Sequence, residues 1–303
     1  MSPHLHHHEQ QPDRNIRLLL VALALITAFM VGEVVAAVLA SSLALLTDAG
    51  HMLTDALALL MAVGAARLAR RPAAGVWTFG LGRAEVLSAG VNGVTLLVVS
   101  AVVLVEAGRR LVHPPHVSGG PVIAVALVGL AVNLVVVVVL SRADRRSLNV
   151  AGAFAHVVTD AYAFAATLVA GIVIVTTGYR RADPIASLVV VLLMLRAAWS
   201  LLRRSGTVLL EAAPEGVDLV DLRAHLLETG LVLDVHDLHA WTFGSGLPAV
   251  SAHVVVTDGC FDGGHAPRLL DELQGCLVGH FDVEHSTFQL EQAGHTDHEA
   301  GTH

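Results

Sequence analysis

The sequence predicts a membrane α-helical bundle of six transmembrane helices, followed by a C-terminal cytoplasmic ferredoxin-like α+β domain. The chain of 303 residues is 54% hydrophobic and only 15% charged, with a mean hydropathy of +0.68. A typical soluble domain is roughly 25% charged. The apolar residues gather in long runs before residue 205, and no run of that kind follows. Because so few charges could not cover a soluble surface, the composition excludes a cytosolic enzyme.

Six apolar segments are long enough to cross a bilayer, whose hydrocarbon core of ~30 Å needs about 20 residues of helix. They end at turn or polar signals such as Arg70-Arg71-Pro72, and they do not alternate as membrane strands do. The segments cover residues 16–39, 43–68, 84–107, 121–140, 150–177 and 184–202. We therefore expect a transmembrane domain over residues 16–204, after a His-rich cytoplasmic tail at 1–15.

The arginines predict the orientation of this bundle. An even number of helices leaves both termini on one side, and positive residues favour the cytoplasmic side. The chain has no lysine, and eleven arginines near the ends of the apolar segments fall on the side of the termini, against four on the other. Both termini are thus expected in the cytoplasm. The net charge of −8 argues against a nucleic-acid partner.

The remaining chain predicts a small two-layer domain over residues 205–292. Its pattern is helix 218–228, strand 232–243, strand 249–257, helix 266–281 and strand 282–291, with a hairpin turn at Gly244-Ser245-Gly246. This α-β-β-α-β order is typical of ferredoxin-like domains. A His-rich tail follows at 293–303. The two cysteines, Cys260 and Cys276, are interpreted as small apolar residues rather than ligands.

One motif occurs in both the second and the fifth predicted helix. His51 and Asp55 belong to a His-x-x-Thr-Asp-Ala-x-Ala string that returns 105 residues later with His156 and Asp160. Residues four apart share a helix face, and an ionisable residue inside a bilayer costs at least ~2.5–3.5 kcal/mol. If the two helices face each other, two imidazoles and two carboxylates converge, which suits four-coordinate Zn²⁺.

Two other functions compete with transport at such a quartet. An intramembrane zinc hydrolase needs a general base beside an open metal, as in His-Glu-x-x-His, and this string is absent. We therefore expect no enzyme and no prosthetic group. A membrane-embedded zinc sensor or scaffold without transport has the same ligands and stays open on sequence alone.

Several segments resemble the cation diffusion facilitator family. Residues 42–55 are similar to its second helix, and Gly80-Leu81-Gly82-Arg83-Ala84-Glu85 to its loop into the third. His236-Asp237-Leu238-His239-Ala240-Trp241, Ser251-Ala252-His253-Val254 and residues 285–291 resemble its cytoplasmic domain. The resemblance covers residues 16–291 and is closest to the bacterial zinc, cobalt and cadmium resistance branch.

The resemblance implies a homodimeric Zn²⁺ exporter of the bacterial cytoplasmic membrane that works by alternating access and exchanges Zn²⁺ for H⁺. Its transport site is carried here by His51, Asp55, His156 and Asp160. Manganese and iron relatives have Asp where this chain has His51, which favours zinc. An exporter that prefers Cd²⁺ or Co²⁺ is the alternative.

The resemblance also implies a regulatory Zn²⁺ site in the cytoplasmic domain. Its expected ligands are His236, His253 and His285, with Glu291 as a weaker candidate. Thr287 stands where some relatives carry a carboxylate, which argues against a binuclear site. His225 and His280 are expected to be surface or packing residues.

Overall fold

The computed structural model describes residues 10–39, 43–113, 119–244, 247–262, 264–283 and 285–295. The chain divides into two compact units, Met1–Ser205 and Gly206–His303. Each unit has its own hydrophobic core. The predicted fold class is confirmed in both units.

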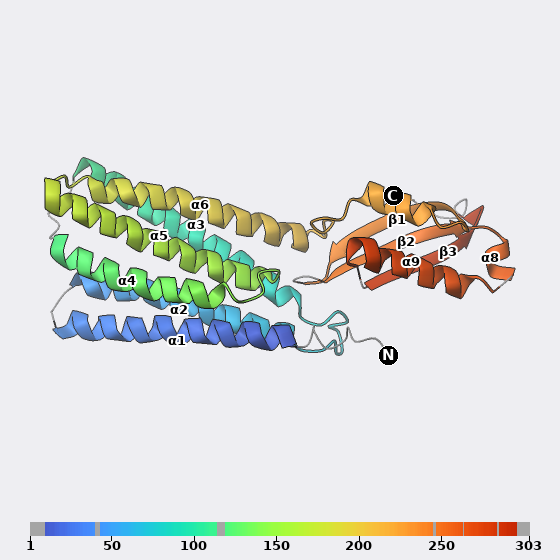
Figure 1. Cartoon of the computed structure of the whole chain (residues 1–303), viewed down its shortest axis with the longest axis horizontal. Helices are drawn as coiled ribbons and strands as arrows, with labels where there is room; N and C mark the ends of the chain where they lie inside the picture. The colour runs from blue at the N-terminus through green and yellow to red at the C-terminus, as the bar shows by residue number, and fades with distance from the viewer. Residues whose placement is uncertain are drawn as a thin grey trace. The chain divides into compact units, whose positions relative to one another are not determined.

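The first unit contains six long helices within its described residues (Figure 1), and all six are long and apolar enough to cross a membrane. The last of them runs beyond the predicted end at 202, because Arg203 and Arg204 are good helix formers and no proline follows. The helices are α1 (Gln10–Leu39), α2 (Leu43–Ala69), α3 (Arg83–Val112), α4 (Gly119–Leu140), α5 (Leu148–Thr177) and α6 (Ala182–Leu209).

The outer surface of these helices is apolar. Val102, Leu192 and Trp199 are 64%, 68% and 71% exposed, and many other large aliphatic side chains face outward. Soluble monomers rarely expose contiguous apolar patches of this extent. The surface therefore suits contact with lipid.

The core of the bundle lies among α1, α2, α4 and α5. Helix α1 packs on α2 and α4, and α5 packs on α4, α3 and α2. Gly129 of α4 sits against the ring of Phe164 in α5, where an added Cβ would lie 2.4 Å from a ring carbon. Small residues allow such close helix contacts in membranes. The fully buried core side chains include Leu19, Ile26, Leu59, Leu140, Val63, Val136 and Val150.

Polar contacts at the start of α5 fix this helix against its neighbours. Ser147 caps α5 by accepting from the Val150 N–H at 3.3 Å, and its hydroxyl donates to Glu85 of α3 at 2.8 Å. Asn149 donates to the backbone carbonyl of Ala62 in α2 at 2.6 Å. The Asn149 contact joins α5 to α2, the two helices that carry the repeated motif, and the Ser147 contact joins α5 to α3.

The second unit is a three-stranded sheet with helices on one face. Its strands lie in the order β1-β2-β3, with β1 antiparallel to β2 and β3 parallel to β2. Buried side chains of α7 and α9 pack against Val250, Ala252 and Val254 of the central strand. The elements are α7 (Leu219–Leu227), β1 (Val232–Thr242), β2 (Pro248–Val256), α8 (Gly259–Asp262), α9 (Ala266–Phe281) and β3 (His285–Gln292).

Two details of this unit differ from the sequence prediction. The short helix α8 was not expected, and β3 begins at His285 rather than at 282. Asp282 adopts a left-handed conformation with φ of 56° and caps α9, so the extended strand starts only after it. The hairpin residues Ser245 and Gly246 lie outside the described residues.

A β-bulge interrupts β1 beside its histidines. His236 pairs with His253 and His239 pairs with Ser251, so two residues of β1 oppose the single residue Ala252. Asp237 has a φ of 49° at this point. Residues three apart on a regular strand face opposite sides, whereas this bulge leaves His236 and His239 on the same face.

Candidate metal-binding sites

Helices α2 and α5 bring three of the four predicted transmembrane ligands together. The Nε2–H of His156 donates to Asp55 Oδ1 across the two helices at 2.8 Å. The same Nε2 lies 3.7 Å from Asp160 Oδ2, one turn further along α5. His156 is only 6% exposed. The repeated motif therefore does place side chains from both helices at one point.

The distances suit a small divalent cation. The three ligand atoms lie within 4.8 Å of one another. Two ligands at ~2.0–2.1 Å from a tetrahedral Zn²⁺ are ~3.3 Å apart, and the distances of 2.8 Å and 3.7 Å bracket this value. Small side-chain rotations can thus convert the hydrogen-bonded group into a coordination shell.

The fourth predicted ligand, His51, lies in α2 one turn before Asp55. Its side chain is outside the described part of the structure. Residues four apart in a helix share a face, so its membership of the site stays a prediction. Thr159, inside the motif, donates its hydroxyl to the Ala155 carbonyl of its own helix at 2.8 Å and is not a ligand in this arrangement.

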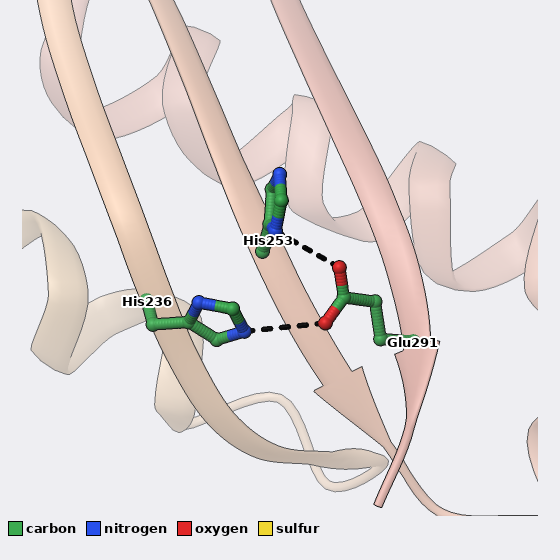
Figure 2. Close-up of side chains that lie close together, drawn as sticks. All are labelled: His236, His253 and Glu291. Carbon is green, nitrogen blue, oxygen red and sulfur yellow. Dashed lines mark hydrogen bonds and ion pairs between the residues drawn. The ribbon is translucent and has the colours of Figure 1, made fainter. Parts of the chain in front are cut away.

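The second cluster lies on the open face of the cytoplasmic sheet, with one side chain from each strand. Figure 2 shows His236 of β1 and His253 of β2 directed at the carboxylate of Glu291 in β3. His236 Nε2 lies 3.2 Å from Glu291 Oε2, and His253 Nδ1 lies 2.9 Å from Oε1. This face is opposite the one that packs on α7 and α9, because its residues alternate with Val254 and Ala252 of the core.

Glu291 is the centre of this cluster. Its side chain is 2% exposed, against 14% for His236 and 24% for His253. A buried carboxylate requires hydrogen-bond donors or a cation. Gln289 donates to its Oε1 at 2.7 Å, and His236 Nε2 is hydrogen-bonded to its Oε2 at 3.2 Å. Two nitrogens and one carboxylate form a ligand set that zinc sites use.

Asp237 extends the cluster toward solvent. Its Oδ1 accepts from His239 Nε2 at 3.2 Å, and its Oδ2 lies 4.0 Å from His253 Nε2. Groups that hydrogen-bond a ligating imidazole orient its ring and tune its basicity. The bulge at Asp237 thus serves the site, because it turns this carboxylate toward His253.

The structure does not bring His285 to this cluster. His285 begins β3 opposite Ala249, whereas His253 is opposite Gln289. Four residues of strand correspond to ~13 Å. The His285 ring instead contacts Phe243 edge-on, with centroids 5.2 Å apart. Of the four residues considered for this domain, His236, His253 and Glu291 form the group.

Each of the two units matches a known protein domain. Residues 19–210 match the description "Cation efflux transmembrane domain", and residues 214–293 match "Cation efflux protein, cytoplasmic domain". The chain belongs to the cation efflux family. The predicted resemblance to cation diffusion facilitators is therefore confirmed.

Named relatives of this cation efflux protein align over nearly their whole length. It is 39% identical to the zinc transporter ZitB of Escherichia coli, with 95% of this chain and 92% of the relative covered. It is 38% identical to the metal cation efflux system protein CzcD of Cupriavidus metallidurans, covering 98% and 93%. The cadmium, cobalt and zinc/H(+)-K(+) antiporter of Bacillus velezensis is 37% identical, covering 96% and 93%.

The cation efflux family assignment identifies the long apolar helices as transmembrane helices. The protein is a multi-pass membrane protein with a cytoplasmic C-terminal domain. It belongs to a family of cation transporters, and its helices α2 and α5 carry ionisable side chains inside the transmembrane unit.

Sequence reasoning about this cation efflux protein did not single out Asp237 or Gln289. Both had a local signal, because Asp237 lies within a His-Asp-Leu-His string and Gln289 shares a strand face with Glu291. Recognising their role required the bulge in β1 and the parallel register of β3, neither of which a local pattern specifies.

Proposed function

We propose that this protein exports Zn²⁺ from the cytoplasm in exchange for protons, using a transport site formed by His51, Asp55, His156 and Asp160. The convergence of Asp55, His156 and Asp160 between two membrane helices is the observation that carries the proposal. The names of the aligned relatives, a zinc transporter and a cadmium, cobalt and zinc antiporter, support the substrate class.

Charge balance favours a divalent cargo. Two ionised aspartates and two neutral histidines carry a charge of −2, which one Zn²⁺ neutralises. An uncompensated charge in a bilayer is expensive, so the metal-loaded site is electrically suited to a passage through the membrane. Imidazole and carboxylate ligands together select Zn²⁺ and its neighbours rather than Mg²⁺ or Ca²⁺.

Proton coupling follows from the hydrogen bond between the helices. The proton on His156 Nε2 is shared with Asp55 Oδ1 at 2.8 Å, and these are two of the atoms that would hold the metal. Metal ligands must be deprotonated, so metal and protons compete for the same sites. A carboxylic acid or imidazolium that holds a proton before loading must release it when Zn²⁺ binds, and protons entering from the other side favour release of the metal.

The orientation of the protein follows from its arginines. We place it in the bacterial cytoplasmic membrane with both termini in the cytoplasm, since eleven arginines lie on that side. The cytoplasmic unit then samples cytosolic metal, and His236, His253 and Glu291 are its regulatory Zn²⁺ site. No prosthetic group and no enzymatic step enters this mechanism.

We further propose that the working form is a homodimer joined by the cytoplasmic domains. The match of residues 214–293 to the cytoplasmic domain of cation efflux proteins supports this assembly. Light scattering of the purified protein in detergent tests the assembly. A mass of one chain across the working concentration range would contradict it.

The transport proposal is tested in proteoliposomes loaded with a zinc-sensitive dye. With an acidic lumen, outward proton flow should drive Zn²⁺ inward, and a protonophore should abolish this uptake. Asp160→Asn and His156→Ala should remove uptake, whereas Tyr162→Phe, a half-exposed neighbour on α5, should keep it.

Three results would count against the proposal. Zinc uptake that ignores the pH gradient excludes antiport, and uptake that survives Asp160→Asn excludes the site. No uptake above that of protein-free liposomes favours the sensor or scaffold instead. Equal concentrations of Cd²⁺ or Co²⁺ taken up faster than Zn²⁺ would identify the alternative exporter.

A further inference from the structure

Side chains of metal-ligating types also lie along the contact between α7 and α9, on the helical face of the cytoplasmic unit. Each of these helices is followed by a strand that runs back along it, and β1 runs opposite to β3. The two helices are therefore antiparallel. Moving forward along α7 corresponds to moving backward along α9.

His225 and His280 form the first pair across this helix contact. Their ring centroids are 5.1 Å apart. His225 Nδ1 lies 2.9 Å from the backbone carbonyl of Asp221, which can only accept, so Nδ1 carries the proton. The lone pair of neutral His225 is thus on Nε2, and Phe281 packs edge-on against the ring at 5.3 Å. A backbone carbonyl that holds Nδ1–H is the usual support of a ligating imidazole.

Glu228 and Cys276 form the second pair, one turn further along the same contact. Glu228 follows His225 by three residues, so these two side chains lie on the same side of α7 and its C-cap. Cys276 precedes His280 by four residues, so these two share a face of α9. Burial raises the pKa of the Cys276 thiol, and the negative charge of Glu228 raises it further. The carboxylate is therefore near enough to act on the sulfur.

We propose that His225, His280, Cys276 and Glu228 form a second cytoplasmic binding site for a thiophilic divalent cation such as Zn²⁺ or Cd²⁺. His225 lies in α7 and Glu228 is its C-cap, whereas Cys276 and His280 lie in α9. Two imidazoles, one thiolate and one carboxylate form a complete four-ligand set. His280 and Glu228 are exposed, so rotation of their side chains toward a metal would not disturb the core.

Thiolate and imidazole ligands decide which cation this site takes. They select Zn²⁺, Cd²⁺ and Co²⁺ over the hard cations Mg²⁺ and Ca²⁺. Cys276 is accessible for this role, since it is only half-buried, whereas Cys260 lies in the core with no exposed surface. The proposal departs from the sequence-based interpretation of Cys276 as a small apolar residue and of His225 and His280 as surface or packing residues.

Binding at this site joins α7 to α9. On binding, the Cys276 thiol releases its proton to solvent and the thiolate sulfur coordinates the metal. No oxidation occurs. The site lies on the opposite face of the sheet from His236, His253 and Glu291, so the two cytoplasmic sites have no ligand in common.

The test uses the full-length, reduced, metal-free protein in detergent, titrated with Co²⁺. A thiolate ligand produces a sulfur-to-cobalt charge-transfer band in the near ultraviolet. The wild type should show this band, and Cys276→Ser should lose it. His225→Ala and His280→Ala should each weaken cobalt binding at this band by at least ~10-fold. Cys260→Ala, His236→Ala and Asp160→Asn are matched controls that should retain it.

Two results would overturn the site. One is a wild type without a thiolate band at excess cobalt. The other is a band that persists in Cys276→Ser or in a His225→Ala/His280→Ala double variant. Circular dichroism and gel filtration of each variant separate loss of ligands from loss of fold. Because the readout is a spectrum rather than a flux, the result is independent of the transport proposal.

Discussion

The membrane site and the sheet site use the same ligand types in contrasting frameworks. In the membrane, Asp55, His156 and Asp160 come from two helices and derive from a motif that recurs 105 residues later. In the sheet, His236, His253 and Glu291 come from three strands, one residue from each. The proposed exchange of cargo requires ligands on helices that can move against each other, whereas a hydrogen-bonded sheet holds its ligands in fixed register. The contrast fits a site that transports and a site that senses.

The largest expected effect comes from replacing a carboxylate in the membrane site. Asp55→Asn keeps the shape of the side chain but removes a ligand charge and the acceptor of the His156 hydrogen bond. We expect zinc uptake into proteoliposomes to fall at least ~100-fold, which corresponds to ~2.7 kcal/mol. Zinc uptake by Asp55→Asn within a few-fold of wild type would contradict a transport role for the membrane site, and with it the proposed difference between the two sites.

The equivalent change in the sheet is Glu291→Gln. It leaves His236 and His253 without the carboxylate that both contact. We expect zinc binding to the cytoplasmic unit of the full-length protein to weaken ~10- to 100-fold by isothermal titration. The control is His285→Ala, which changes an exposed histidine outside the cluster and should leave this affinity unchanged. If His285→Ala weakens zinc binding and Glu291→Gln does not, then His285 is the third ligand, as the family resemblance implies.

A change in helix packing should lower the stability of the membrane unit without affecting zinc binding at the sheet site. Gly129→Ala places a methyl group 2.4 Å from the Phe164 ring and should separate α4 from α5. We expect a loss of about 1–3 kcal/mol of stability, seen as a lower melting temperature in detergent. Gly64→Ala, in α2 with open space around it, is the control and should melt as wild type. A Gly129→Ala protein as stable as the control would contradict the close helix contact.

The smallest expected effect is on the alkylation rate of Cys276, which should respond to a change on its own face of the cytoplasmic unit and not to one on the other face. The raised pKa of Cys276 leaves less thiolate at pH 8 than an ordinary thiol has. Glu228→Gln lowers this pKa by removing the nearby charge, so alkylation of Cys276 at pH 8 should accelerate, by roughly twofold because exposed charges are screened. Glu291→Gln, on the other face, should leave the rate unchanged. An unaltered rate in Glu228→Gln would place the carboxylate too far from the sulfur to act on it.

Local sequence patterns predicted the helices better than the contacts between strands. The helix over 266–281 was expected with the bounds that the structure shows, because its apolar residues Leu269, Leu273 and Leu277 recur on one face. The membrane cluster was also predictable, since a repeated His-Asp pair inside a bilayer requires a common partner. The grouping of Glu291 with His236 was not, because it depends on a bulge and a parallel register that relate residues 55 positions apart. Asp282 delayed the start of β3 through a conformation that few non-glycine residues adopt.

The place of Glu291 on the last strand has a consequence for how the protein is made. Every predicted ligand of the membrane site has been synthesised once the ribosome passes Asp160, whereas the sheet site waits for the final strand, β3, at the end of the described chain. A nascent chain can therefore hold every predicted ligand of the membrane site while the sheet site still lacks its central carboxylate.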